Sequence, residues 1–125
     1  MADLDTQIQE ARAAIDAHVV EIVQWHFSPE TGCPFWLDWA RDAGWDPAAE
    51  VKCLDDLLAK FPNFQDEWLR DKQPEVWVPK AFLGKPFNIF ETGGTTGMPK
   101  GVACTHGNIT FQGSSKLHNY FEGAR

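Results

Sequence analysis

The first 25 residues carry apolar side chains at intervals of three and four positions, which is the period of an α-helix with one buried face. The stripe consists of Leu4, Ile8, Ala11, Ile15, Ile22 and Trp25. Asp3, Asp5 and Thr6 offer capping groups at its start, and Pro29 follows its end as a stop signal. We expect an amphipathic helix that packs on its own domain. A coiled-coil dimer is the alternative, but about three heptads and a histidine in the seam favour it less.

Proline and glycine divide the next part of the chain into short helices. Pro34 suits the first turn of a helix that Gly44 ends, and Asp46 is an N-cap candidate directly before another proline. Further short helices are expected over 54–61 and 64–70. Helices of this length depend on tertiary partners, so their many Trp and Phe side chains should be buried against something.

The last third of the chain changes character. A β-prone run over 87–90 leads into a loop rich in glycine and threonine, and a second short strand is expected over 102–105. Asn108 is then a candidate N-cap for a final helix. The sequence therefore predicts an α/β chain, in which short N-terminal helices precede a unit of strand, glycine loop, strand and helix.

Charge divides the chain at about the same place. The 125 residues carry a formal charge of −7, with 6 Lys and Arg against 16 Asp and Glu in residues 1–78, but 5 against 2 in residues 79–125. A net negative charge argues against a general nucleic-acid binder. We therefore treat 1–78 as a helical segment and 79–125 as the segment that carries the chemistry.

Several other classes of protein are not indicated. No apolar run approaches the roughly 18 to 20 residues that a membrane helix needs, and the acidic N-terminus does not have the pattern of a secretory signal. We expect a cytoplasmic protein. The three cysteines, Cys33, Cys53 and Cys104, are widely spaced, so neither a disulfide framework nor a thiolate zinc site is predicted.

The glycine loop has the composition of a phosphate-binding site. Its glycines allow backbone N–H groups to approach an anion, its threonines add hydroxyl donors, and its lysine adds a mobile cation. It is not a Walker A loop, because Pro99 precedes the lysine and a strand follows it. A flexible hairpin loop is the alternative interpretation. The candidate phosphate-binding residues are Thr92, Gly93, Gly94, Thr95, Thr96, Gly97 and Lys100.

The run from Thr92 to Val102, Thr-Gly-Gly-Thr-Thr-Gly-Met-Pro-Lys-Gly-Val, resembles the phosphate-binding signature of the adenylate-forming superfamily. That superfamily includes acyl-CoA synthetases, luciferases and the adenylation domains of peptide synthetases. Gly93 replaces the serine of the common form, and Glu91 is an unusual neighbour for a triphosphate. More loosely, segments such as His26-Phe27-Ser28-Pro29 and Gly44-Trp45-Asp46-Pro47 resemble the N-terminal region of phenylacetate-CoA ligase-type enzymes.

The resemblance implies an ATP-dependent ligase that activates an aryl or related carboxylic acid as an acyl-adenylate and passes it to CoA or to a carrier-protein thiol. It implies ATP and Mg²⁺ as cofactors, with Thr95 or Thr96 on the Mg²⁺ side, and no membrane or nucleic-acid partner. Residues 1–78 and 79–125 would be parts of one incomplete N-terminal domain, since the motifs for adenine, ribose and the catalytic lysine would lie beyond Arg125.

No catalytic residue is carried over by the resemblance, and we expect the 125-residue chain alone to be inactive. His106 follows the loop closely, but an ionised carboxylate substrate needs no general base, so a structural role is favoured. Cys104 has no neighbour that would activate its thiol as an acyl acceptor. The alternative function is a short, non-catalytic helical interaction module with a vestigial anion-binding loop.

Overall fold

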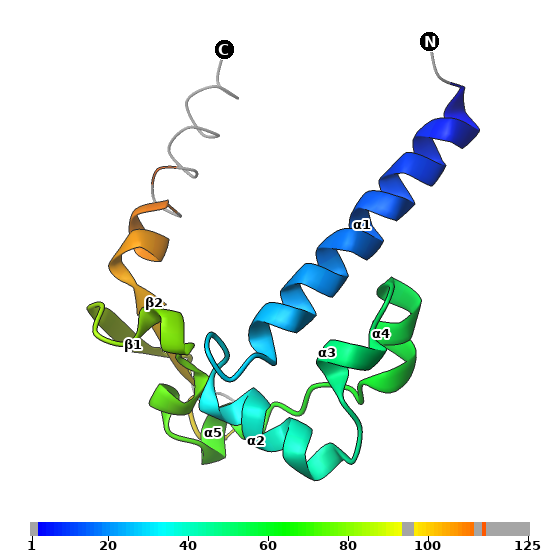
Figure 1. Ribbon diagram of the computed structural model, residues 1–125. Coiled ribbons are helices and arrows are strands. Elements are labelled where there is room, and N and C mark those ends of the chain that lie inside the picture. The colour runs from blue at the N-terminus through cyan, green and yellow to red at the C-terminus, as the bar shows by residue number, and fades with distance from the viewer. Residues whose placement is uncertain (1–2, 94–96, 112–113, 115–125) are drawn as a thin grey trace. The chain divides into compact units, whose positions relative to one another are not determined.

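The computed structural model describes residues 3–93, 97–111 and 114 (Figure 1). The chain separates into two compact units. The first contains Met1–Phe64 and Pro79–Ala81, and the second contains Gln65–Val78 and Phe82–Arg125. Residues 65–78 thus belong to the unit that contains the glycine loop, although the division by charge places them in the helical segment. The prediction that the two segments are parts of one incomplete domain stays a prediction.

The first unit is built from four helices that begin and end at the predicted signals. They are α1 (Leu4–His26), α2 (Pro34–Ala43), α3 (Pro47–Glu50) and α4 (Leu54–Lys60). The Thr6 amide donates to the Asp3 carboxylate over 2.8 Å at the start of α1. Gly44 ends α2 with φ 77°, a left-handed conformation that glycine adopts without strain. Asp46 accepts from the Ala49 amide at the start of α3. These capping predictions are confirmed.

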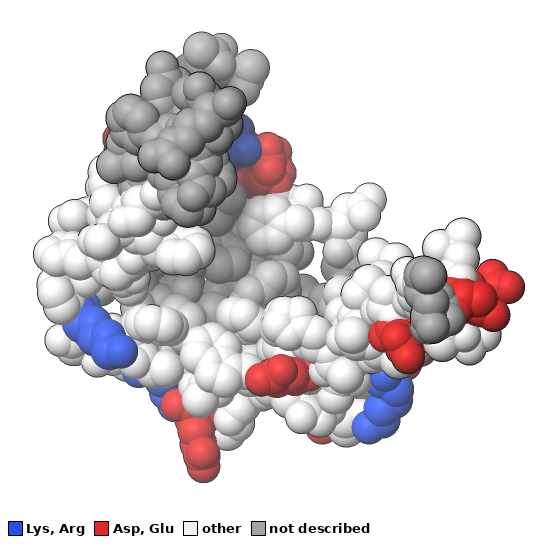
Figure 2. Space-filling view, turned by 90° about the horizontal axis from the view of Figure 1, so that it is seen from above, with Lys and Arg blue, Asp and Glu red and all other residues white. Residues whose placement is uncertain are grey.

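Helix α1 packs on α3 and α4. The Leu54 amide donates to Asp16 Oδ1 over 2.9 Å, which ties the start of α4 to the middle of α1. Val23 is the one α1 residue that is buried, whereas Leu4 is 70% exposed. The expectation of a helix that packs along its apolar stripe is therefore only partly right. Figure 2 shows acidic side chains beside the start of α1, where Asp5 lies in the first turn.

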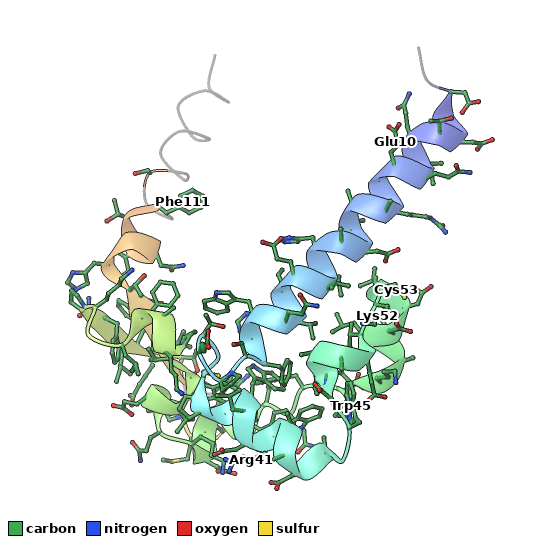
Figure 3. All side chains as sticks on the ribbon, in the orientation of Figure 1. Glu10, Arg41, Trp45, Lys52, Cys53 and Phe111 are labelled. Atoms are coloured by element: carbon green, nitrogen blue, oxygen red, sulfur yellow. The ribbon has the colours of Figure 1, made fainter. Side chains whose placement is uncertain are left out.

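An aromatic cluster joins the end of α1 to α2 and α4, as the abundance of Trp and Phe in this part predicts. The Trp39 and Phe61 rings stack with centroids 5.1 Å apart and an interplanar angle of 14°. Trp45, in the turn between α2 and α3 (Figure 3), meets the Phe61 ring edge-on at 5.1 Å. Phe27 and Trp36 complete the cluster. Offset and edge-on geometries of this kind are the favoured arrangements of aromatic pairs.

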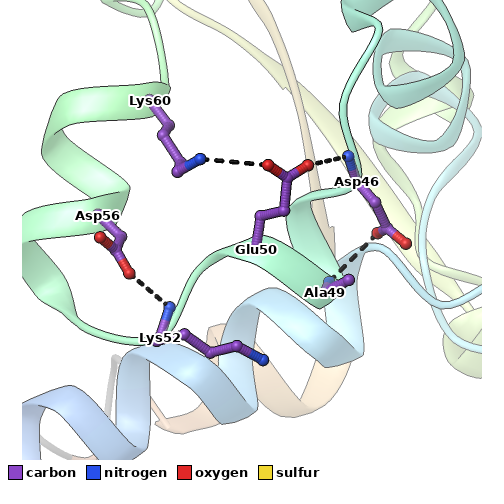
Figure 4. A network of polar contacts seen from close by, with 6 residues as sticks. All are labelled: Asp46, Ala49, Glu50, Lys52, Asp56 and Lys60. Carbon is purple, nitrogen blue, oxygen red and sulfur yellow. Dashed lines mark hydrogen bonds and ion pairs between the residues drawn. The ribbon is translucent and has the colours of Figure 1, made fainter.

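A polar network ties α3 to α4 on the surface of the first unit (Figure 4). Glu50 accepts from the Asp46 amide over 2.9 Å and from Lys60 Nζ over 3.3 Å. Asp56 accepts from the Lys52 amide over 2.9 Å, directly before α4. The Glu50 carboxylate thus reaches back to the start of its own helix, in the manner of a capping box, while it pairs with a lysine of the next helix.

The second unit has short helical segments followed by a β-hairpin. Its elements are α5 (Trp68–Asp71), the 3₁₀ helix η1 (Pro74–Trp77), β1 (Phe87–Glu91) and β2 (Gly101–Thr105), and a further 3₁₀ helix, η2 (Lys80–Phe82), spans the boundary between the units. The strands pair antiparallel from Phe87 opposite Thr105 to Glu91 opposite Gly101. Residues 106–111 and 114 are helical.

Two predictions in this unit are wrong in detail. The expected helix over 64–70 is reduced to Trp68–Asp71, because residues 63–65 have no regular secondary structure and residues 66–67 form a turn. The final helix begins at residue 106, so Asn108 is not its N-cap. Instead the Asn108 amide donates to Thr105 Oγ1 over 3.1 Å. Threonine at the end of the strand therefore supplies the cap three positions earlier, although asparagine is the more favoured N-cap residue.

At the coarse level the α/β prediction is confirmed, since the chain combines helices with a small two-stranded sheet. The sheet is an antiparallel hairpin whose strands are joined by the glycine loop. Among the described residues, no helix has the length and apolar character to cross a membrane.

Candidate anion-binding site

The hairpin holds both ends of the glycine loop together. Beyond the last strand pair, the Thr92 amide donates to the Lys100 carbonyl over 3.0 Å. The Lys100 amide in turn donates to Thr92 Oγ1 over 3.1 Å. Because the Thr92 hydroxyl only accepts in this contact, its own hydrogen is left for another acceptor. The threonine and the lysine of the predicted phosphate loop therefore lie side by side at its base.

The ammonium group of Lys100 contacts a carboxylate in the segment before α5. Lys100 Nζ lies 2.6 Å from Asp66 Oδ2, and the two side chains are 25% and 58% exposed. The hydrogen bond from Lys100 and the charges of Lys100 and Arg70 lower the pKa of the Asp66 carboxyl group below its ordinary value. Asp66 is consequently ionised, and it neutralises the cation that the loop offers.

Arg70 attaches α5 to the returning arm of the loop. Its Nε donates to the Met98 carbonyl over 2.9 Å, and its side chain is only 20% exposed. Nη1 lies 3.9 Å from Glu67 Oε1, which is a long and weak pairing across one helical turn. Arg70 therefore brings a second, half-buried positive charge to the loop and fixes the backbone next to Gly97.

These groups surround a cavity of about 240 Å³. Its lining consists of Asp66, Arg70, Thr92, Gly93, Gly97, Met98 and Lys100. Gly97 has φ 143°, where a side chain would be strained. The space beside Gly93 is open, because a Cβ there would meet no atom within 4 Å. The loop backbone is thus accessible at Gly93 and dependent on glycine at Gly97.

Four of the seven predicted residues meet in this cavity, namely Thr92, Gly93, Gly97 and Lys100. Gly94, Thr95 and Thr96 lie outside the described residues. Asp66 and Arg70 were missed by the sequence analysis. Their spacing of four positions, which is typical of neighbours on one helix face, is the one signal that could have drawn attention to them.

The cavity suits phosphate groups better than a whole nucleotide. Two cations, a hydroxyl and a glycine backbone are the groups that bind phosphate oxygens. Its volume is smaller than the roughly 300–1,000 Å³ of pockets that enclose a drug-sized ligand. Larger cavities, of about 570 and 450 Å³, lie in the first unit, but their linings are mostly aromatic and aliphatic.

The described residues offer few ligands for Mg²⁺. They contain no group of three or more His, Cys, Asp or Glu side chains that could hold a metal ion. Mg²⁺ usually keeps several waters and is held by substrate phosphates with one or two carboxylates. Mg²⁺ bound in this way would need few protein ligands. Asp66 is the carboxylate that lines this cavity, so it is the residue that could contribute one.

His106 and Cys104 lie close to the loop in sequence but outside the lining of the cavity. His106 is exposed in the first turn after β2, where its carbonyl accepts from Thr110 Oγ1 over 3.0 Å. Cys104 is a free, half-buried thiol on β2. Neither position provides a nucleophile or a base to this site.

Comparison with known protein families finds no family model that matches the chain, and no curated protein matches its sequence significantly. The predicted resemblance to adenylate-forming enzymes therefore stays a prediction from the residues of the loop and of the short helices before it.

Proposed function

We propose that this chain is the N-terminal portion of an ATP-dependent carboxylic acid–CoA ligase, to which it contributes the loop that binds the ATP phosphates. The observation that carries the proposal is the pairing of Thr92 with Lys100 at the base of a hairpin loop, beside a small cavity with two cations. Lysine and arginine side chains that line the same small cavity are typical of sites that bind phosphate oxygens.

Three described residues of the loop, Thr92, Gly93 and Lys100, have a role in this proposal. Lys100 supplies a positive charge whose three N–H donors can follow phosphate oxygens. Thr92 supplies a hydroxyl donor beside Lys100 at the base of the loop. Gly93 leaves room for a phosphate group to approach the backbone. ATP supplies the phosphoryl group that activates the acid, with pyrophosphate as the leaving group, and CoA or a carrier-protein thiol accepts the acyl group.

The same view explains why we expect no turnover from residues 1–125 alone. Phosphate contacts without contacts to the base and ribose supply a small part of nucleotide affinity, so we expect ATP to bind this chain only in the millimolar range. Glu91 ends β1 next to the loop and, unlike Thr92, does not line the cavity. Its carboxylate therefore does not face a phosphate bound beside Thr92.

The direct test of the ligase proposal is ATP–pyrophosphate exchange by the longest polypeptide that the gene encodes, with a panel of aromatic and aliphatic carboxylic acids. Exchange that depends on an aryl acid and is lost in Lys100→Met is the expected result. Exchange with none of the acids would overturn the proposal.

A second candidate function is an interaction module. It is favoured by the exposed apolar stripe of α1, where Leu4, Ile8 and Ile15 are 70%, 44% and 49% exposed. A surface of this kind is typical of a helix that binds another helix or domain. Sedimentation of the chain would distinguish the two: a stable dimer that dissociates in Ile8→Gln/Ile15→Gln, together with no response to ATP, would favour the module.

A further inference from the structure

We propose that Asp66 is an internal placeholder, whose carboxylate occupies the position at Lys100 that a phosphate oxygen takes when a triphosphate binds. The inference rests on the proposed phosphate-binding function and adds a competing residue to that site. In this view the lysine of the loop is already paired with an anionic group, Asp66, and an incoming phosphate must displace that group.

The geometry of the pair supports this role. The contact between Lys100 Nζ and Asp66 Oδ2, at 2.6 Å, has the short length of a charge-assisted hydrogen bond. A phosphate oxygen binds a lysine by the same type of contact at a similar distance. Asp66 also lines the cavity with Thr92 and Gly93, so its carboxylate group belongs to a residue that borders the space next to the loop.

Asp66 compensates one of the two positive charges at the cavity. Lys100 pairs with Asp66, whereas Arg70 makes only a weak contact of 3.9 Å with Glu67, which does not line the cavity. A polyphosphate that approaches this site therefore meets one uncompensated cation where the loop and α5 could offer two. Removal of the Asp66 charge alone leaves an excess positive charge at Lys100, where the loop backbone and the Thr92 hydroxyl also converge.

The difference in exposure indicates which partner moves. The Lys100 side chain is 25% exposed, whereas the Asp66 side chain is 58% exposed. Water can therefore solvate the Asp66 carboxylate after a small rotation, while the lysine stays at the cavity. Such a placeholder also disfavours simple carboxylates at Lys100, since they offer nothing that Asp66 does not already supply, and this would keep the acid substrate out of the phosphate position.

The test is a titration of the 125-residue chain with inorganic tripolyphosphate, without metal and at low ionic strength, followed by amide NMR shifts of Gly93, Gly97 and Lys100. The variants are Asp66→Asn, Lys100→Met and the double variant. Asp71→Asn is the matched control, because it removes one carboxylate from α5 in the same unit, and Asp71 does not line the cavity.

We expect Asp66→Asn to bind tripolyphosphate about two- to fivefold more tightly than the wild type, the range that an exposed ion pair contributes. Asp71→Asn should gain distinctly less. The double variant should bind no more tightly than Lys100→Met, because the gain depends on a released lysine. A gain of affinity is a readout that a merely structural role of Asp66 would not produce.

The remaining outcomes distinguish the placeholder role of Asp66 from the proposed phosphate-binding function. If the wild type binds, Lys100→Met binds more weakly, and Asp66→Asn binds no more tightly than the wild type, the placeholder is overturned and the phosphate site stands. Weaker binding by Asp66→Asn also overturns it, because Asp66 would then assist the anion. If no variant binds, both the placeholder and the proposed function are overturned.

Discussion

Lys100 and Asp66 form an ion pair of 2.6 Å across 34 positions of the chain, and this pair joins the end of the glycine loop to the segment before α5. Its hydrogen bond is the main cause of the lowered pKa of Asp66. The pair thus determines both the charge that the loop presents and the way in which the second unit is held together.

The first prediction concerns this pKa. In Lys100→Met the pKa of Asp66 should rise toward the ordinary value of 3.8, because both the hydrogen bond and the charge of Lys100 are lost. A lowered pKa in the folded state stabilises the fold above the ordinary value, and this contribution is lost as the pH falls through the folded pKa. Carboxyl NMR titration measures the pKa directly. Lys80→Met, which removes a lysine of the first unit, should leave the Asp66 pKa unchanged.

Arg70 should be needed for the position of the loop as well as for its charge. Arg70→Ala removes the donor to the Met98 carbonyl and should weaken tripolyphosphate binding about threefold or more. Arg70→Lys keeps the charge but loses the planar Nε–H group, so its affinity should be intermediate. Glu67→Gln, which changes only the weak contact to Nη1, is the control. Equal affinity of Arg70→Ala and the wild type would remove Arg70 from the site.

His26 should make the first unit sensitive to pH. Its Nδ1 is buried without a hydrogen-bond partner among the described residues, and burial lowers its pKa below 6.5. The unfolded chain therefore binds the proton more readily, and stability should fall as the pH decreases below about 6.5. In His26→Phe the unfolding midpoint should change less between pH 7 and pH 5. His18→Gln, at a position 69% exposed on α1, should retain the wild-type dependence.

Two glycines of the second unit should respond to alanine in opposite directions. A Cβ at Gly101 would lie 2.8 Å from Pro74 Cγ, and the proline ring cannot rotate away. Gly101→Ala should destabilise the hairpin by about 1–3 kcal/mol. Gly107 has no atom within 4 Å of its would-be Cβ and lies in the helix after β2, so Gly107→Ala should stabilise by about 0.4–1 kcal/mol. Amide exchange of β1 and β2 would measure both effects, and a stable Gly101→Ala hairpin would contradict the contact with Pro74.

The parts of the fold that sequence could predict are those with local causes. Asp3, Pro34 and Gly44 mark helix ends because each acts on backbone groups within a few positions. The strand, loop and strand around Thr92 and Lys100 are likewise confirmed in the structure. The error at Asn108 is also local, because Thr105 is a second capping residue three positions earlier and accepts from the Asn108 amide.

The parts that sequence could not predict depend on distant contacts. The pairing of Asp66 with Lys100 and the bond from Arg70 to Met98 join positions far apart in the chain, so no local period signals them. The exposed stripe of α1 has the same origin, since periodicity gives a helix an apolar face but does not say how much of that face a neighbour covers. The sequence therefore predicts the loop of the candidate site, but not Asp66 and Arg70, which line the cavity beside the loop.

The most direct test of the central claim is an amide NMR titration of the 125-residue chain with Mg²⁺–ATP. The account predicts saturable shifts at Gly93, Gly97 and Lys100 with millimolar affinity, weakened about tenfold or more in Lys100→Met, since a charged hydrogen bond is lost. Shifts of equal size and affinity in Lys100→Met, or no shifts at these three amides up to saturating ATP, would contradict it.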